Sequence, residues 1–251
     1  QNGDVYELNL CMPLKGKASS NASWPLFCRL QNLTQAPFSG YLQCRSARIM
    51  SGSPERFLKR EGDRLMSQPI KGTVRRGRSA EEDNALIDAL QSSEKERAEN
   101  VMIVDLVRND LSRIAQKATV EVTELCGIHS FQTVHQMVST IECRLDKDKG
   151  LSDILRATFP MGSMTGAPKI SAMKHIDRIE PEGRGSYSGS IGYITPKGDF
   201  DFNVLIRSLF HNSMTEMLVA NVGGAITSLS DAQEEYEECM LKAEAILKAV
   251  S

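Results

Sequence analysis

The order of the predicted elements constrains the fold of this chain more than any other feature of its sequence. Strand-like segments come in consecutive groups, and segments of helical periodicity separate these groups. Such grouping is typical of α+β proteins with antiparallel or mixed sheets, whereas regular alternation of strands and helices indicates a parallel sheet. No G-x-G-x-x-G follows a predicted strand and no Walker loop is present, which argues against a nucleotide-binding α/β fold.

Helical periodicity is clearest in the middle and at the end of the chain. Ser79 is a predicted N-cap, because the acidic side chains that follow it suit the first turn of a helix. One or two helices are expected from there to about Gln116. Three more helices are expected, a short one over 151–158, one that ends near Glu180, and a closing one over 231–250.

Strands are predicted on both sides of the turn Glu61-Gly62-Asp63, and the first third of the chain is interpreted as strand-rich. His211 is placed in a turn. The strands expected around the first turn and later in the chain cover residues 53–60, 64–68, 120–125, 134–145, 187–195, 200–210 and 214–222.

The composition restricts the class of function. The 251 residues include 30 basic and 32 acidic side chains, and a net charge of −2 argues against a nucleic-acid-binding protein. No apolar run reaches the length of about 18 residues that a membrane span needs. Six cysteines are widely spaced without a C-x-x-C, which favours reduced thiols and a cytoplasmic location. The length is consistent with one catalytic domain over residues 1–251.

A lysine in the tight segment Pro69-Ile-Lys-Gly-Thr73 is the first candidate for chemistry. An amine becomes a nucleophile when burial or nearby cations lower its pKa. Arg75, Arg76 and Arg78 supply such cations. A surface lysine in a basic turn has the same pattern, so both interpretations of Lys71 stay open.

Carboxylates on predicted helices form a second candidate set. Glu235 and Glu238 are three residues apart and share one helix face, and Glu99 lies on another helix. Carboxylates of this kind, with substrate oxygens and water, suit octahedral Mg²⁺. Lys242 follows one turn after Glu238. A solvated acidic helix face is the alternative interpretation.

Three further features suit an anionic ligand. The segment Gly162–Lys169 combines small residues with a helix start, and adjacent glycines Gly223 and Gly224 lie near a predicted strand end. Arg207, expected in the middle of a strand, and Tyr193, expected on a neighbouring strand, are placed to flank an anion. A capped loop, an ordinary bulge and a snorkelling arginine are the alternatives.

Together these segments resemble the chorismate-utilising enzymes, which include anthranilate, aminodeoxychorismate, isochorismate and salicylate synthases. The resemblance covers essentially the whole chain. It implies an α+β fold, a four-layer α/β/β/α sandwich of two mixed, largely antiparallel sheets, with the active site between the sheets. The motifs that carry it are Gly3–Leu10, Ser53–Phe57, Pro69–Thr73, Ala98–Leu106, Arg108–Asp110, Gly162–Lys169, Gly189–Tyr193, Ile206–Arg207 and Glu235–Lys242.

The residue before Gly72-Thr73 is similar to that of the aminodeoxychorismate synthases, since the other branches generally have alanine there. This resemblance implies that Lys71 attacks C2 of chorismate and expels the C4 hydroxyl, after which ammonia adds at C4 and releases the lysine. Glu55 matches the family's general acid/base. The base lysine of the isochorismate and salicylate branch is replaced by Glu7, which counts against that branch.

The resemblance also implies partners for this chemistry. Mg²⁺ would be held by Glu99, Glu235 and Glu238, and would neutralise a chorismate carboxylate. Ammonia would come from a glutamine amidotransferase subunit, in para-aminobenzoate and folate biosynthesis. The implied substrate-site positions are Gly72, Thr73, Thr165, Tyr193, Arg207, Gly223, Gly224 and Lys242.

Two departures from the family pattern stand out. Gln136 occupies a position where the family often has histidine, and His135 is expected to face the other side of the strand. A region that precedes the motifs in longer members is expected to be absent here. The alternative functions are anthranilate synthase, with lysine tolerated at position 71, and a non-catalytic chorismate-binding or assembly module.

Overall fold

The structure, a computed structural model, describes residues 3–251. The chain separates into two compact units, each described here by itself. Unit 1 contains the chain up to Glu55 together with Met164–Gly192 and Asn203–Ser251, and unit 2 contains Arg56–Ser163 and Tyr193–Phe202. The chain therefore crosses from one unit to the other several times.

Unit 1 is built on a six-stranded sheet with the order β2-β3-β12-β13-β1-β9, and its paired strands run antiparallel. Its elements are β1 (Glu7–Lys17), α1 (Ser23–Thr34), β2 (Phe38–Cys44), β3 (Ala47–Ser53), β9 (Gly166–Ala167), α5 (Lys169–Ile179), β12 (Ser208–Asn212), β13 (Met217–Ile226) and α6 (Ala232–Val250).

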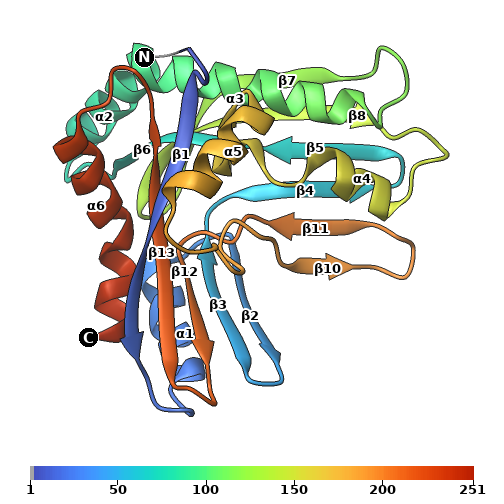
Figure 1. Cartoon of the computed structure of the whole chain (residues 1–251). Helices are drawn as coiled ribbons and strands as arrows, with labels where there is room; N and C mark the ends of the chain where they lie inside the picture. The colour runs from blue at the N-terminus through green and yellow to red at the C-terminus, as the bar shows by residue number, and fades with distance from the viewer. Residues whose placement is uncertain (1–2) are drawn as a thin grey trace. The chain divides into compact units, whose positions relative to one another are not determined.

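Helices α1 and α6 cover one face of this sheet (Figure 1). Leu26, Phe27 and Leu30 recur at helical spacing on α1, so they form one apolar face. They pack with Met50 of β3 and Ile246 of α6 in a common core. Burial of these side chains stabilises the sheet, whose strand β13 carries the glycines of the predicted site, and holds α6, which carries two of its carboxylates, against that sheet.

Unit 2 contains a seven-stranded sheet with the order β10-β11-β4-β5-β8-β6, in which β7 also pairs with β8. Helices α2 and α3 pack against β6, β7 and β8 (Figure 1). Its elements are β4 (Arg56–Glu61), β5 (Arg64–Gln68), β6 (Ile70–Arg75), α2 (Ala80–Ser92), α3 (Glu94–Ser112), β7 (Glu121–Ser130), β8 (Val134–Arg144), α4 (Leu151–Thr158), β10 (Gly192–Ile194) and β11 (Phe200–Asn203). A 3₁₀ turn (Gly162–Met164) follows α4 in the chain.

The predicted α+β class with largely antiparallel sheets is confirmed. The hairpin at Gly62, whose φ is +62°, and the N-cap at Ser79, which accepts from the N–H of Glu82, are also as predicted. Among the described residues, no helix is long and apolar enough to cross a membrane.

The first third of the chain is strand-rich as predicted, although it also contains the helix α1. Three local predictions are wrong. The strand expected over 187–195 is reduced to β10. The strand expected over 200–210 is divided into β11 and β12. His211 lies within β12 rather than in a turn, buried with its Nδ1 2.7 Å from Oγ of Ser23.

Candidate active site

Lys71 lies on β6 where the ladder with β8 is irregular. The register shifts between Ile70 and Thr73, and Gly72 has a φ of +82°. Any other residue at position 72 would be strained by this φ, and its Cβ would lie 2.9 Å from Cδ1 of Leu90. Glycine is therefore required after the lysine, in a bulge of the kind that re-aims side chains at active sites.

The side chain of Lys71 is buried beside a carboxylate. Lys71 is 9% exposed, and its Nζ lies 3.9 Å from Oε2 of Glu99 on α3, which is 6% exposed. Burial removes both groups from water, so each depends on the charges and polar groups around it. Two predicted site residues are thus brought together within unit 2.

The basic loop after β6 is neutralised by the first turn of α2. Arg75 pairs with Glu82, and Arg76 donates to both carboxylate oxygens of Asp83 at 2.7 and 3.0 Å. Hydrogen bonds from Arg76 and from the N–H of Gly77 hold the pKa of Asp83 well below its usual range. Two of the three arginines expected to supply cations near Lys71 are therefore each paired with a carboxylate of α2.

Adjacent residues of β8 reach different neighbours. Gln136 pairs with Thr73 across the ladder, and its Nε2 lies 3.4 Å from Oγ1 of Thr73. The Nε2 of His135 instead lies 2.9 Å from Asp83, which confirms that the two side chains point in opposite directions. Gln136 is 3% exposed, and its Oε1 has no hydrogen-bond partner within residues 3–251. A buried acceptor of this kind favours a donor from a ligand.

The glycines of β13 allow close approach from two sides. A Cβ on Gly223 would lie 2.4 Å from the carbonyl oxygen of Leu10 on β1. A Cβ on Gly224 would lie 3.3 Å from Oε2 of Glu235 and 3.8 Å from Nζ of Lys242, both on α6. The structure thus brings five of the predicted site positions of unit 1 together, since Lys242 also bonds to Gly223 and Glu238.

Lys242 is anchored by two acceptors. Its Nζ donates to the carbonyl oxygen of Gly223 at 3.0 Å and lies 2.6 Å from Oε1 of Glu238, one helical turn earlier. The lysine therefore links the end of β13 to α6.

The predicted magnesium ligands come from both units, Glu99 from α3 and Glu235 and Glu238 from α6. Glu235 is 6% exposed and accepts from Oγ of Ser230 at 2.7 Å. Carboxylate oxygens are the donors that Mg²⁺ prefers, so the chemistry of the set fits the metal. In the part of the chain that the structure describes, no three His, Cys, Asp or Glu side chains are grouped to hold a metal. The magnesium site stays a prediction.

Arg207 lies between β11 and β12, not in the middle of a strand, and has a φ of +50°. Burial lowers the pKa of its guanidinium, and the coulombic interactions with Tyr187 and Glu238 act in the opposite direction. No ion pair or side-chain hydrogen bond joins Arg207 to any other residue of 3–251. A desolvated cation of this kind suits an anionic ligand. Tyr193, expected beside it, lies on β10 in unit 2 and is 63% exposed.

Thr165 is held in a buried loop against β1. Its carbonyl oxygen accepts from the N–H of Asn9 at 2.9 Å, and Thr165 is 3% exposed. Gly166, with a φ of +129°, follows it, and a Cβ there would lie 2.1 Å from the carbonyl oxygen of Glu7. Glycine is therefore needed at position 166 for packing on β1.

Glu55 lies just after β3 and is 5% exposed. Its N–H donates to Oγ of Ser53 at 3.2 Å, and its carbonyl oxygen accepts from the N–H of Val204 at 3.1 Å. These contacts hold its backbone, and its role as general acid/base stays a prediction.

The sequence profile of a family described as chorismate binding enzyme matches residues 1–248. The chain belongs to this family. Aminodeoxychorismate synthase component 1 of Escherichia coli (strain K12) is 40% identical over 98% of this chain and 54% of its own length. Aminodeoxychorismate synthase of Streptomyces griseus is 43% identical over 98% of this chain and 34% of its own length.

Solved structures agree with the family assignment. Anthranilate synthase component I from Streptococcus pneumoniae TIGR4 is 33% identical, with a TM-score of 0.86 over 97% of this chain and 53% of that chain. The isochorismate synthase MenF of Escherichia coli is 22% identical with a TM-score of 0.85, and shows the shared fold. This chorismate binding enzyme chain spans about half the length, or less, of the curated relatives it matches.

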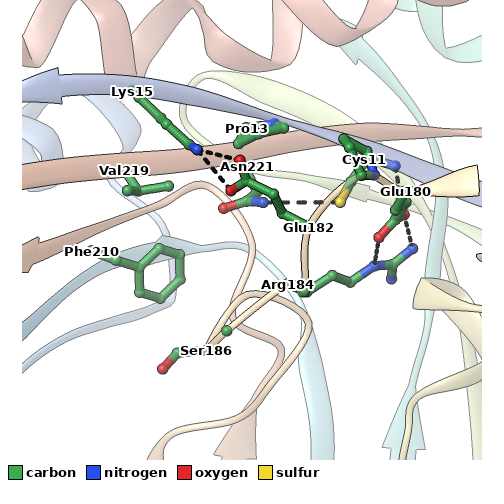
Figure 2. A pocket seen from close by; sticks show the side chains of 13 residues that line it. Cys11, Pro13, Lys15, Glu180, Glu182, Arg184, Ser186, Phe210, Val219 and Asn221 are labelled. Atoms are coloured by element: carbon green, nitrogen blue, oxygen red, sulfur yellow. Dashed lines mark hydrogen bonds and ion pairs between the residues drawn. The ribbon is translucent and has the colours of Figure 1, made fainter. Parts of the chain in front are cut away.

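One buried ion pair in this chorismate binding enzyme was missed by the sequence interpretation. Glu180 and Arg184 lie after α5, with side chains 6% and 13% exposed and a shortest N···O distance of 2.6 Å. Their spacing of four residues was the available signal, but α5 ends at Ile179 and Pro181 prevents its continuation, so no helix face carries the pair. Both line a pocket of about 240 Å³ in unit 1, bounded by β1, β12, β13 and the loop over 180–186 (Figure 2).

Proposed function

We propose that this chain is the chorismate-converting part of an aminodeoxychorismate synthase, and that it forms 4-amino-4-deoxychorismate from chorismate and ammonia. The identity of 40–43% to relatives of that name, over nearly the whole chain, supports the proposal. The product would enter para-aminobenzoate and folate biosynthesis.

The observation that carries this proposal is the buried amine of Lys71 beside Glu99. The next residue, Gly72, has a positive φ that other residues would adopt only with strain. In the proposed reaction, Lys71 forms a bond from Nζ to C2 of chorismate and Nζ gives up a proton, while the ring double bonds shift and the C4–O bond breaks. Glu55 donates the proton that turns the leaving hydroxyl into water. Ammonia then bonds at C4, the double bonds shift back, and the C2–N bond breaks to release Lys71.

The remaining polar residues bind and orient the substrate in this proposal. Arg207, Lys242, Tyr193, Thr165, Thr73 and the N–H groups near Gly223 would contact the carboxylates and ring substituents of chorismate. Mg²⁺, held by Glu99, Glu235 and Glu238, would neutralise one substrate carboxylate. The desolvated guanidinium of Arg207 supports an anionic ligand.

A glutamine amidotransferase subunit is the proposed source of ammonia. The name component 1, carried by the relatives from Escherichia coli and Salmonella typhimurium, supports such a partner. We place the activity in the cytoplasm, and the wide spacing of the six cysteines without a C-x-x-C supports reduced thiols there.

Mass spectrometry of the protein with chorismate and Mg²⁺, but without ammonia, tests the proposal directly. We expect a covalent adduct that maps to Lys71 and disappears when ammonium is added. Lys71→Ala should show no adduct. Lys59→Ala, which removes a lysine paired with Glu61 on β4, should behave as the wild type.

Product analysis with chorismate, Mg²⁺ and ammonium separates the alternatives. Release of anthranilate without an added lyase would assign the chain to the anthranilate branch. The similarity to anthranilate synthase component I from Streptococcus pneumoniae is the reason to test this alternative. Absence of any product from both the wild type and Lys71→Ala would favour a non-catalytic binding module.

A second pair of variants leaves the lysine in place. Gly72→Ala and Gly198→Ala both introduce a side chain at a similar φ, +82° and +85°, but only position 72 has atoms within 4 Å of the new Cβ. We expect both to lose about 1 kcal/mol of stability from the left-handed backbone. Only Gly72→Ala should also reduce adduct formation, by about a hundredfold, because it displaces Lys71.

A further inference from the structure

The guanidinium of Arg184 uses all five of its N–H donors inside unit 1. Two bonds, of 2.8 and 2.6 Å, go to the carboxylate of Glu180. The other three reach the carbonyl oxygen of Met164 at 2.6 Å, the carbonyl oxygen of Asn9 at 2.8 Å and Oγ of Ser188 at 3.0 Å. One side chain therefore joins three segments that are distant in sequence, and Figure 2 shows it facing Glu180 at one end of the pocket.

The first connection leads to Thr165. Arg184 bonds to the carbonyl oxygen of Met164, the residue just before it, and to that of Asn9. The N–H of Asn9 in turn donates to the carbonyl oxygen of Thr165 at 2.9 Å. The loop that carries Thr165 is thus held from two sides by contacts that include Arg184.

The second connection leads to Gly223. Oε1 of Glu180 accepts from the N–H of Cys11 at 3.0 Å, as well as from Arg184. Cys11 is the register partner of Gly223 in the β1–β13 ladder, and a Cβ on Gly223 would lie 3.0 Å from Cβ of Cys11. The ion pair therefore holds β1 at the point where it meets the glycines of β13.

The third connection leads to Arg207. Ser188, which accepts from Arg184, has a φ of +61°, and its N–H donates to the carbonyl oxygen of Leu205 at 3.1 Å. The N–H of Leu205 donates back to Gly189 at 2.8 Å. These two backbone hydrogen bonds hold Leu205, two residues before Arg207, in the segment between β11 and β12.

We propose that the Glu180–Arg184 pair is a positioning device that sets the places of Thr165, Gly223 and Arg207 relative to one another within unit 1. That these three groups bind chorismate rests on the proposed function. An error of about 1 Å in such a constellation lowers catalytic efficiency by about a hundredfold. Lysine cannot replace the arginine, because its three donors leave from one nitrogen and cannot span the five acceptors.

The test uses the full chain with the variants Arg184→Lys and Glu180→Gln, which retain similar size and polarity. Lys15→Met is the matched control, because Lys15 lines the same pocket but pairs with Glu182 at its exposed rim. Two readouts are combined, amide hydrogen exchange of the unliganded protein and steady-state kinetics with chorismate and ammonium.

We expect faster exchange at the amides of Asn9, Cys11, Ser188 and Leu205 in both variants, with exchange in unit 2 unchanged. The KM for chorismate should rise about tenfold or more with a smaller change in kcat, equivalent to about 1.4 kcal/mol in binding. A purely structural role would instead lower the active fraction, and therefore kcat, at constant KM. Lys15→Met should match the wild type in both readouts.

Unchanged exchange at these four amides in Arg184→Lys and Glu180→Gln would overturn the positioning role, whatever the kinetics. Faster exchange with unchanged KM would also overturn it, since the three groups would then be insensitive to the pair. If the wild type neither binds nor converts chorismate, the proposed function fails, and the exchange data alone decide whether the pair orders these segments.

Discussion

Unit 1 contains two partly buried guanidinium groups in opposite electrostatic surroundings. Arg184 makes five hydrogen bonds and an ion pair with Glu180. Arg207 makes no ion pair or side-chain hydrogen bond with any other residue of the described chain. The pKa values differ accordingly. Burial alone would lower the pKa of Arg184, but the interaction with Glu180 raises this pKa above the ordinary value. For Arg207, burial lowers the pKa below the ordinary value.

The difference separates a structural charge from one that is available to a ligand. A buried charge that is fully paired inside the protein is held in place, and its loss leaves its partner unpaired. A buried charge without such a partner remains costly until an anion binds it. Arg184 therefore contributes to the native structure of unit 1, and Arg207 is the better candidate for direct contact with a substrate carboxylate.

The largest effect expected from this comparison is on stability. Arg184→Met leaves Glu180 buried without its counter-charge, so the free energy of unfolding should fall by about 3 kcal/mol. Urea denaturation at neutral pH measures the change. A loss below about 1 kcal/mol would show that the pair contributes no more than a surface ion pair, and the contrast with Arg207 would fail.

The next effect concerns ligand binding. Arg207→Met removes a desolvated cation, so the free energy of unfolding should stay the same or rise. The KM for chorismate should increase by about one order of magnitude or more, because a charge-assisted hydrogen bond is lost. Kinetics and urea denaturation of the same preparation check both halves. A marked loss of stability would mean that Arg207 has a structural role like that of Arg184.

A third arginine provides a pH-dependent comparison. Arg76 lowers the pKa of Asp83, so this carboxylate stabilises the fold fully above the ordinary aspartate pKa of about 3.9. The contribution is lost as the pH falls below that value towards the lower folded-state pKa. Asp83→Asn should therefore lower the urea midpoint at pH 7, and the gap to the wild type should close in acid. A gap that stays constant down to pH 3 would contradict the assignment.

The smallest expected effect is at Arg76 itself, whose side chain is 40% exposed. Arg76→Gln should shift the urea midpoint only slightly, and the shift should shrink in 1 M salt, where the screening length is about 3 Å. Arg184→Met should retain its effect in salt because its ion pair is shielded from solvent. Equal salt sensitivity of the two variants would remove the distinction between surface and buried pairs.

Elements with strong local signals were predicted well. The helix α4 has the bounds expected from its sequence, and both the Gly62 turn and the Ser79 cap lie where turn and capping residues indicated. Helix α1 was missed although Leu26, Phe27 and Leu30 have helical spacing. Apolar residues alone do not distinguish a short helix from a strand among neighbouring strands.

The strand expected through Arg207 failed for a different reason. Val204, Leu205 and Ile206 form an apolar run typical of a buried strand. In the structure the N–H groups of Val204 and Leu205 bond to Glu55 and Gly189, which are distant in sequence, and Arg207 turns to a positive φ. No local pattern reports such partners, because they come from other segments of the folded chain.

The sequence by itself determined the α+β class, the order of the chorismate-family motifs, and a lysine before Gly72-Thr73. These depend on residue type and local spacing. Only the tertiary structure decided which charges are neutralised. It paired Arg75 and Arg76 with α2, placed Lys71 beside Glu99, and left Arg207 without an ion pair among the described residues. The physical reason is that the state of a charge depends on burial and on neighbours brought together by folding.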